Sequence, residues 1–118
     1  MENNIILIYM DIKKLLHLFH IVVVGGLFLY VGIKREKISS GLFSVLFYLG
    51  IFIVVYHLYK AYGYWEMDKA FWVNLIHILI VGPVLVYIGY NGEKTSRKFF
   101  EILLMLGFAA IGYHGYYY

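Results

Sequence analysis

Four apolar stretches, separated by short charged segments, dominate this chain and cover residues 15–33, 41–59, 71–90 and 99–116. A helix rises 1.5 Å per residue, so about 20 apolar residues cross the hydrocarbon core of a bilayer. Backbone groups in lipid must be hydrogen-bonded within their own element, which excludes an open sheet. The pattern therefore predicts an all-α integral membrane protein whose four transmembrane helices pack as a four-helix bundle.

The composition fits a lipid environment and argues against several classes of function. Hydrophobic residues make up 63% and charged residues 14% of the 118 residues, whereas soluble domains have about 45–50% apolar and about 25% charged residues. The spans leave no room for a separate catalytic domain, so we expect a single membrane domain over residues 1–118. Cysteine is absent, which excludes thiolate metal sites and cysteine nucleophiles. Phosphate-binding loops and hydrolase motifs are absent too, and the sequence does not predict an enzyme.

The net charge of +3 does not indicate a nucleic-acid partner, because the basic residues lie at the helix ends rather than along one face. The predicted partner is the lipid bilayer. Since the bundle is small, we also expect it to form a homo-oligomer or to join a larger membrane complex.

The second half of the sequence repeats the first half with an offset of 57 residues and no gaps. Of the 52 positions in residues 10–61, 19 are identical in residues 67–118. A high apolar content raises the number of matches expected by chance, but it does not explain why His, Asp and Glu-Lys recur at the same offset. The sequence therefore predicts two tandem duplicated transmembrane hairpins, with repeat units 10–61 and 67–118.

Each repeat unit has an even number of spans, so both hairpins enter the membrane from the same side. This makes them parallel repeats, related by a pseudo-twofold axis along the membrane normal. The hairpin-loop side carries six basic residues and the terminal side four: Lys34, Arg35, Lys37, Lys94, Arg97 and Lys98, against Lys13, Lys14, Lys60 and Lys69. The positive-inside rule then predicts cytoplasmic hairpin loops and both termini outside.

Four of the five histidines recur at the offset of 57 residues, His20 with His77 and His57 with His114. In an antiparallel hairpin, the start of the first helix and the end of the second lie at one membrane face. We therefore expect these four histidines in one layer on the terminal side, with His17 on the helix face of His20. Neutral imidazole binds transition metals and haem iron, and it titrates near neutral pH. The layer is the candidate site for a metal, for haem, or for the passage of protons or ions.

Two tyrosines and six glycines accompany this layer. Tyr56 and Tyr113 each precede a duplicated histidine and are placed to donate hydrogen bonds or to lie at the headgroup level. Small residues let membrane helices approach closely. This predicts helix packing at Gly25, Gly32 and Gly50 and at their counterparts Gly82, Gly89 and Gly107.

Three residues carry expectations about the helix ends and shape. Asp11 and Asp68 precede the first helix of each unit, where an acidic N-cap would complement the helix dipole. Pro83 stands where the first half has Gly26, and it is expected to kink the third helix.

Three functions remain open at this point. The first is a non-enzymatic membrane protein whose histidine layer binds a metal or haem, or passes protons or ions. The second is a structural or assembly membrane protein, for example of a virion or a larger complex, with no bound cofactor. The third is a channel-forming oligomer.

Residues 107–116, with the ending Gly-Tyr-His-Gly-Tyr, resemble small multi-span membrane proteins of large algal DNA viruses and of marine metagenomes. The resemblance covers mainly the second repeat, and it implies no function. The histidine layer is similar to that of bis-histidine haem proteins of the cytochrome b type, although this chain has one such layer where several of those proteins have two.

Overall fold

The structure is a computed structural model that describes residues 2–118, nearly all of them helical. Four long helices follow one another, and two of them are built from successive segments. The segments are α1 (Glu2–Phe19), η1 (His20–Val24) and α2 (Gly25–Lys34) in the first helix, α3 (Ser40–Glu66) in the second, α4 (Trp72–Ile76), η3 (His77–Val81) and α5 (Gly82–Asn91) in the third, and α6 (Arg97–Tyr117) in the fourth. Two 3₁₀ turns, η2 (Arg35–Lys37) and η4 (Gly92–Lys94), open the hairpin loops.

All four long helices have the length and the apolar composition needed to cross a membrane. The candidate spans are Asn3–Lys37, Ser40–Glu66, Trp72–Lys94 and Arg97–Tyr117. Most of their large apolar side chains are exposed on the outside of the protein, which is favourable in lipid and unfavourable in water. No strand occurs among residues 2–118. The prediction of an all-α chain with four membrane-length helices is therefore confirmed.

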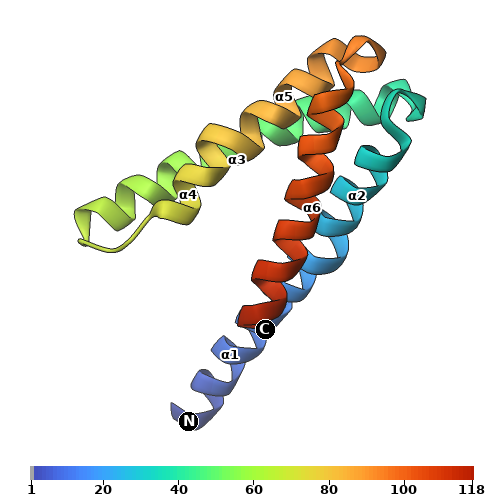
Figure 1. The fold of residues 1–118 in the computed structure, drawn as a ribbon. Coiled ribbons are helices and arrows are strands. Elements are labelled where there is room, and N and C mark those ends of the chain that lie inside the picture. The colour runs from blue at the N-terminus through green and yellow to red at the C-terminus, as the bar shows by residue number, and fades with distance from the viewer. Residues whose placement is uncertain (1) are drawn as a thin grey trace.

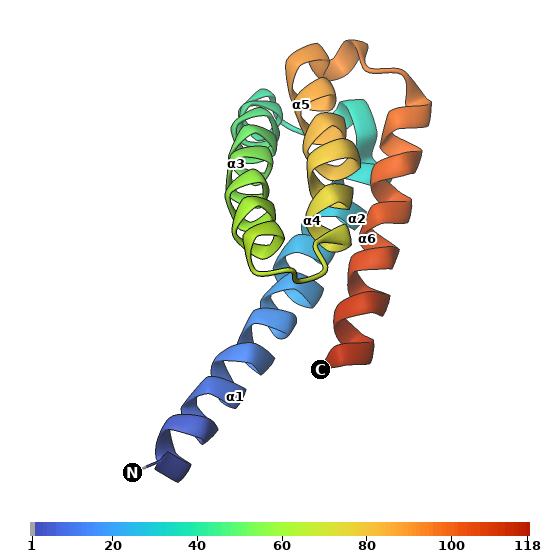
Figure 2. The same cartoon turned by 90° about the vertical axis from the view of Figure 1, so that its left-hand side faces the viewer.

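The helices form two antiparallel pairs, and each pair combines the two halves of the sequence (Figure 1). α3 packs along α5, and α2 packs along α6 (Figure 2), whereas the two helices of one hairpin touch each other far less. The pairs meet at the hairpin-loop end, where η2 contacts η4, and diverge toward the other end (Figure 1). The predicted bundle is thus two crossing pairs rather than four evenly packed helices.

The fully buried apolar side chains of both pairs form one shared core. The core residues are Leu46, Leu85 and Ile88 in the α3–α5 pair, and Phe28, Val31, Phe100 and Leu103 in the α2–α6 pair. In α2, α5 and α6 these residues recur at a spacing of about one helical turn, so each of these helices presents one buried stripe to the shared core. All seven lie between the histidines and the hairpin loops along the chain.

Glycines lie where the paired helices come closest. A Cβ atom added at Gly50 would lie 2.8 Å from the carbonyl oxygen of Gly82, and one added at Gly32 would lie 2.8 Å from Cβ of Leu104. The other four glycines assigned to packing are crowded in the same way, Gly25 by Ile111, Gly82 by Val54, Gly89 by the backbone of Phe47 and Gly107 by Phe28 and Leu29. Such contacts supply the close packing that holds helices together in lipid.

A π-helical turn interrupts the first and the third long helix at matching places. η1 begins at His20 and η3 begins at His77. In η1 the N–H of Gly25 donates to the carbonyl oxygen of His20, and η3 ends with the same kind of bond. Pro83 follows η3, but Gly26 follows η1, so proline alone does not account for the π turn. Turns of this type often lie at functional sites.

The two predicted aspartate caps are wrong. α1 begins at Glu2, so Asp11 lies inside a continuous helix, and α4 begins after Phe71 rather than after Asp68. The Asp11 side chain is exposed and leaves the backbone hydrogen bonds intact, so it does not stop the helix. Asp68 has a φ of 54° in the turn after α3, a conformation that Asp adopts more readily than most residues.

Candidate functional site

The histidines form two clusters at the end of the helix pairs that lies away from the hairpin loops. The first histidine cluster consists of His17 in α1, His20 in η1 and His114 in α6, and the second consists of His57 in α3, Asn74 in α4 and His77 in η3. Each cluster joins the two helices of one pair, and therefore the two halves of the sequence. The four duplicated histidines form two stacked pairs, and each pair combines one histidine from each half of the sequence.

In the first histidine cluster, the rings of His20 and His114 stack with their centroids 4.3 Å apart and their planes 24° apart. Nδ1 of His17 lies 2.8 Å from Nδ1 of His114, so one of these rings donates a hydrogen bond and the other accepts it. His17 is only 9% exposed. Within residues 2–118, its Nε2 atom is buried without a hydrogen-bond partner.

The second histidine cluster has almost the same geometry. The rings of His57 and His77 stack with their centroids 4.1 Å apart and their planes 18° apart. Nδ1 of His57 donates to Oδ1 of the buried Asn74 over 2.8 Å. At the offset of 57 residues Asn74 corresponds to His17, so the two clusters differ chiefly in this one side chain.

Hydrogen bonds to the backbone fix the histidines that open the π turns. Nδ1 of His20 donates to the carbonyl oxygen of Leu16, and Nδ1 of His77 donates to that of Val73, both over 2.8 Å. A neutral ring that donates from Nδ1 has its lone pair on Nε2. His20 and His77 are therefore held in one orientation and one tautomer.

The two tyrosines pack beside the clusters. The ring of Tyr56 lies edge-on to His57, and that of Tyr113 lies edge-on to His114, at centroid distances of 5.2 and 5.1 Å. Tyr113 also meets Trp72 edge-on at 6.1 Å, which is a contact between the two helix pairs. In the part of the chain that the structure describes, neither hydroxyl group bonds to a histidine. The tyrosines thus contribute ring packing.

The clusters are pairs of rings rather than a preformed chelate. Over residues 2–118, no group of three or more His, Cys, Asp or Glu side chains is arranged to hold a metal ion. The lone pairs of Nε2 in a stacked pair lie in two nearly parallel ring planes about 4 Å apart, so they do not converge on one ion. Haem would require its two axial histidines on opposite faces of the macrocycle, and rings about 4 Å apart leave no space for it. What the clusters do in this arrangement is link two helices.

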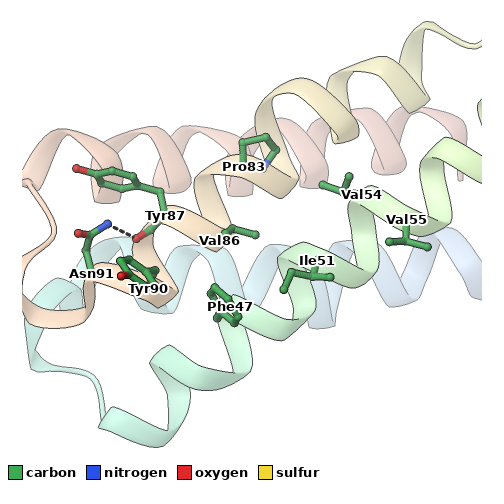
Figure 3. Close-up of a pocket in the computed structure, with 9 residues that line it drawn as sticks. All are labelled: Phe47, Ile51, Val54, Val55, Pro83, Val86, Tyr87, Tyr90 and Asn91. Atoms are coloured by element: carbon green, nitrogen blue, oxygen red, sulfur yellow. Dashed lines mark hydrogen bonds between the residues drawn. The ribbon is translucent and has the colours of Figure 1, made fainter.

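A shallow apolar groove lies along the α3–α5 pair (Figure 3). Its lining residues are Phe47, Ile51, Val54, Val55, Pro83, Val86, Tyr87, Tyr90 and Asn91. The Asn91 side-chain amide donates to the carbonyl oxygen of Tyr87 over 2.8 Å, so this polar group is already bonded within its own helix. The groove therefore offers apolar surface, as expected where a helix pair faces lipid.

Asn74 is the residue of the site that the sequence analysis did not single out. The available signal was its position, because Asn74 stands 57 residues after His17 and both are polar residues within an apolar stretch. Periodicity did not predict which histidines pair. The histidines lie at the same membrane depth whether the helices pair within one hairpin or across the two halves. The sequence therefore does not distinguish these two arrangements.

Comparison with known protein families, with curated proteins and with solved structures finds no match for this chain. Its function is therefore argued from the fold and from the two histidine clusters. The residues that carry the argument are those that join two helices within a pair.

Proposed function

We propose that this chain is a structural or assembly membrane protein, built as a tandem duplicate of one transmembrane hairpin. The observation that carries the proposal is that the polar side chains within the spans are used to join helices. His114 bonds to His17 and His57 bonds to Asn74, and a stacked ring accompanies each bond. Helices associate in lipid through close packing and interhelical hydrogen bonds, and the two clusters supply both.

Local structure supports the duplication independently of sequence identity. The π turns η1 and η3 begin 57 residues apart, and so do the 3₁₀ turns η2 and η4. Buried positions follow the same offset: Phe28 with Leu85, Val31 with Ile88, Phe43 with Phe100, Leu46 with Leu103, and Ile38 with Thr95. A duplication of one hairpin, in which the helices of one copy pack against those of the other, accounts for this agreement.

The packing of the spans favours a structural role over transport through a single chain. Fully buried apolar side chains fill both pairs between the histidines and the loops. The buried polar side chains of residues 2–118 are His17, Asn74 and Thr95, of which only Thr95 lies near the loops. A proton or ion path needs polar groups along its length. A channel would therefore require walls from several copies of the chain.

The proposal is tested on detergent-purified protein, beside a variant in which His20, His57, His77 and His114 are all changed to Ala. A structural role predicts a colourless native protein without stoichiometric metal, by absorption spectroscopy and elemental analysis. It also predicts a variant that still inserts but unfolds more easily, by about 1–3 kcal/mol for the two lost interhelical bonds. Gly26→Ala is the matched control, because nothing lies within 4 Å of a Cβ atom there. A Soret band or bound metal that disappears in the variant would contradict the proposal.

A transition-metal site at the first histidine cluster is the second candidate function. It is favoured by the hydrogen bond from His20 Nδ1 to a backbone carbonyl, which is how metal-ligating histidines are commonly oriented. It is also favoured by the buried, unbonded Nε2 of His17. Zn²⁺ titration by calorimetry separates the candidates, since His17→Asn makes the first cluster resemble the second. Binding that this variant weakens supports the metal site, and no binding by the native protein removes it.

We further propose that the hairpin loops face the cytoplasm and that both termini lie outside, because the loop side has more basic residues. The natural lack of cysteine gives a clean background for labelling. With a membrane-impermeant maleimide on intact cells, Ala70→Cys should be labelled and Ser40→Cys should be protected. The opposite pattern would reverse the orientation.

A further inference from the structure

The two hairpin loops lie side by side and form one surface. η2 contacts η4, and both loops are anchored on the core by a buried residue, Ile38 in the first and Thr95 in the second. The Thr95 hydroxyl donates to the carbonyl oxygen of Ile88 over 3.4 Å. The charged side chains around this contact are called the loop patch, and they are Lys34, Arg35, Glu36, Lys37, Glu93, Lys94, Arg97, Lys98 and Glu101.

The loop patch carries the entire formal net charge of the protein. It has six basic and three acidic side chains, a net charge of +3, which equals that of the whole chain. The basic and acidic residues on the terminal side cancel one another. Within the patch, Arg97 Nε lies 3.1 Å from Glu101 Oε1. The four lysines of the patch are exposed, and Arg35 is half-buried. The charge is therefore concentrated at one end of the molecule and open to binding.

Arg35 holds a backbone conformation that favours glycine. Its φ and ψ are 55° and −126°, and Gly92, at the matching place in the other loop, has 58° and −132°. A side chain in this region is strained, and strain of this kind persists where the residue has a task. The matching turn in the second hairpin loop forms with Gly92, so this turn does not require an arginine. The arginine is therefore explained by its charge rather than by the turn.

We propose that the loop patch binds the phosphate-bearing headgroups of anionic lipids. The patch occupies the loop-side ends of the candidate spans, and the ends of membrane-spanning helices lie at the depth of the headgroups. Arginine and lysine donate charge-assisted hydrogen bonds to phosphate oxygens, and clustered basic residues beside transmembrane helices attract anionic lipid. This inference concerns the opposite end of the molecule from the histidine clusters and does not depend on their function.

The test uses the full chain in nanodiscs of phosphatidylcholine with graded fractions of phosphatidylglycerol. Lipids retained by the protein are counted by native mass spectrometry, and the unfolding midpoint is recorded for each composition. We expect preferential retention of phosphatidylglycerol and a midpoint that rises with its fraction. The triple variant Lys94→Gln, Lys98→Gln and Lys37→Gln should lose this preference, by about fivefold for each cation removed.

A matched variant with Lys13→Gln, Lys14→Gln and Lys60→Gln removes three cations from the terminal side and should keep the preference. Arg35→Gly provides the second test, because it removes a charge and relieves strain together. Its midpoint in pure phosphatidylcholine should rise, while its preference for phosphatidylglycerol falls, so a folding defect is not the explanation. Equal retention of both lipids by the native protein, or an equal loss in the terminal-side variant, would overturn the proposal.

Discussion

The two histidine clusters have nearly the same geometry but differ in one partner. In both, a histidine of one half stacks on a histidine of the other half at 4.1–4.3 Å, and a hydrogen bond of 2.8 Å closes the cluster. The bonding partner is His17 in the first and Asn74 in the second. Both clusters therefore have the stacked rings and the hydrogen bond between helices, although the bonding partner is histidine in one and asparagine in the other. The difference leaves one buried nitrogen of His17 without a partner within residues 2–118.

The largest effect is expected from filling the close helix contact in either pair. Gly89→Leu in the α3–α5 pair and Gly32→Leu in the α2–α6 pair push a side chain against a neighbouring backbone. Each should lower the free energy of unfolding by about 3 kcal/mol, measured by SDS titration. Gly26→Leu, in open space, should leave it unchanged. If only one of the two variants is destabilised, the pairs are not equivalent.

A cavity on either side of the shared core should have the next largest effect. Leu46→Ala and Leu103→Ala remove matching, fully buried side chains from the two pairs. In lipid the cost of such a substitution comes mainly from lost packing contacts, because the lipid tails are as apolar as the protein core. We therefore expect a loss of about 2 kcal/mol for each variant. The measurement is the same SDS titration, with the exposed Met105→Ala as the control. Costs that differ by more than twofold would show that one pair dominates the stability.

Removing the partner of a stacked histidine should cost less. Asn74→Leu leaves Nδ1 of His57 without its 2.8 Å bond, and we expect a loss of about 1 kcal/mol. Asn74→His, which makes the second cluster resemble the first, should recover most of it. A histidine variant no more stable than the leucine variant would argue that the bond contributes little.

The smallest effect has the opposite sign. His17→Asn converts the first cluster to the pattern of the second and removes the buried, unbonded Nε2. We expect a gain of about 0.5–1 kcal/mol, seen as a higher thermal midpoint in detergent. A loss of stability would mean that His17 contributes more through packing than its unbonded nitrogen costs.

The sequence was sufficient to predict the four long helices, because the length of each apolar stretch matches a bilayer. It was not sufficient for the start of the first helix. Charged residues such as Asp11 suggested a boundary, yet exposed charges do not interrupt helical hydrogen bonds, and α1 begins at Glu2. The recurrence of His20 and His77 was visible in the sequence, but their stacking partners were not. Pairing depends on how glycine contacts such as Gly50 with Gly82 fit between helices, and hydrophobic periodicity does not encode that fit.

The pairing of helices across the two halves has a consequence for biosynthesis. Helix α2 packs along α6, which belongs to the fourth long helix. The first long helix therefore enters the membrane without its partner and has to wait until the ribosome has made α6. During this interval Gly25 and Gly32, which later lie against α6, face lipid or another nascent chain. Assembly of the α2–α6 pair is thus a late event. Where several ribosomes translate one message, pairing between the helices of separate nascent chains would occur during this interval.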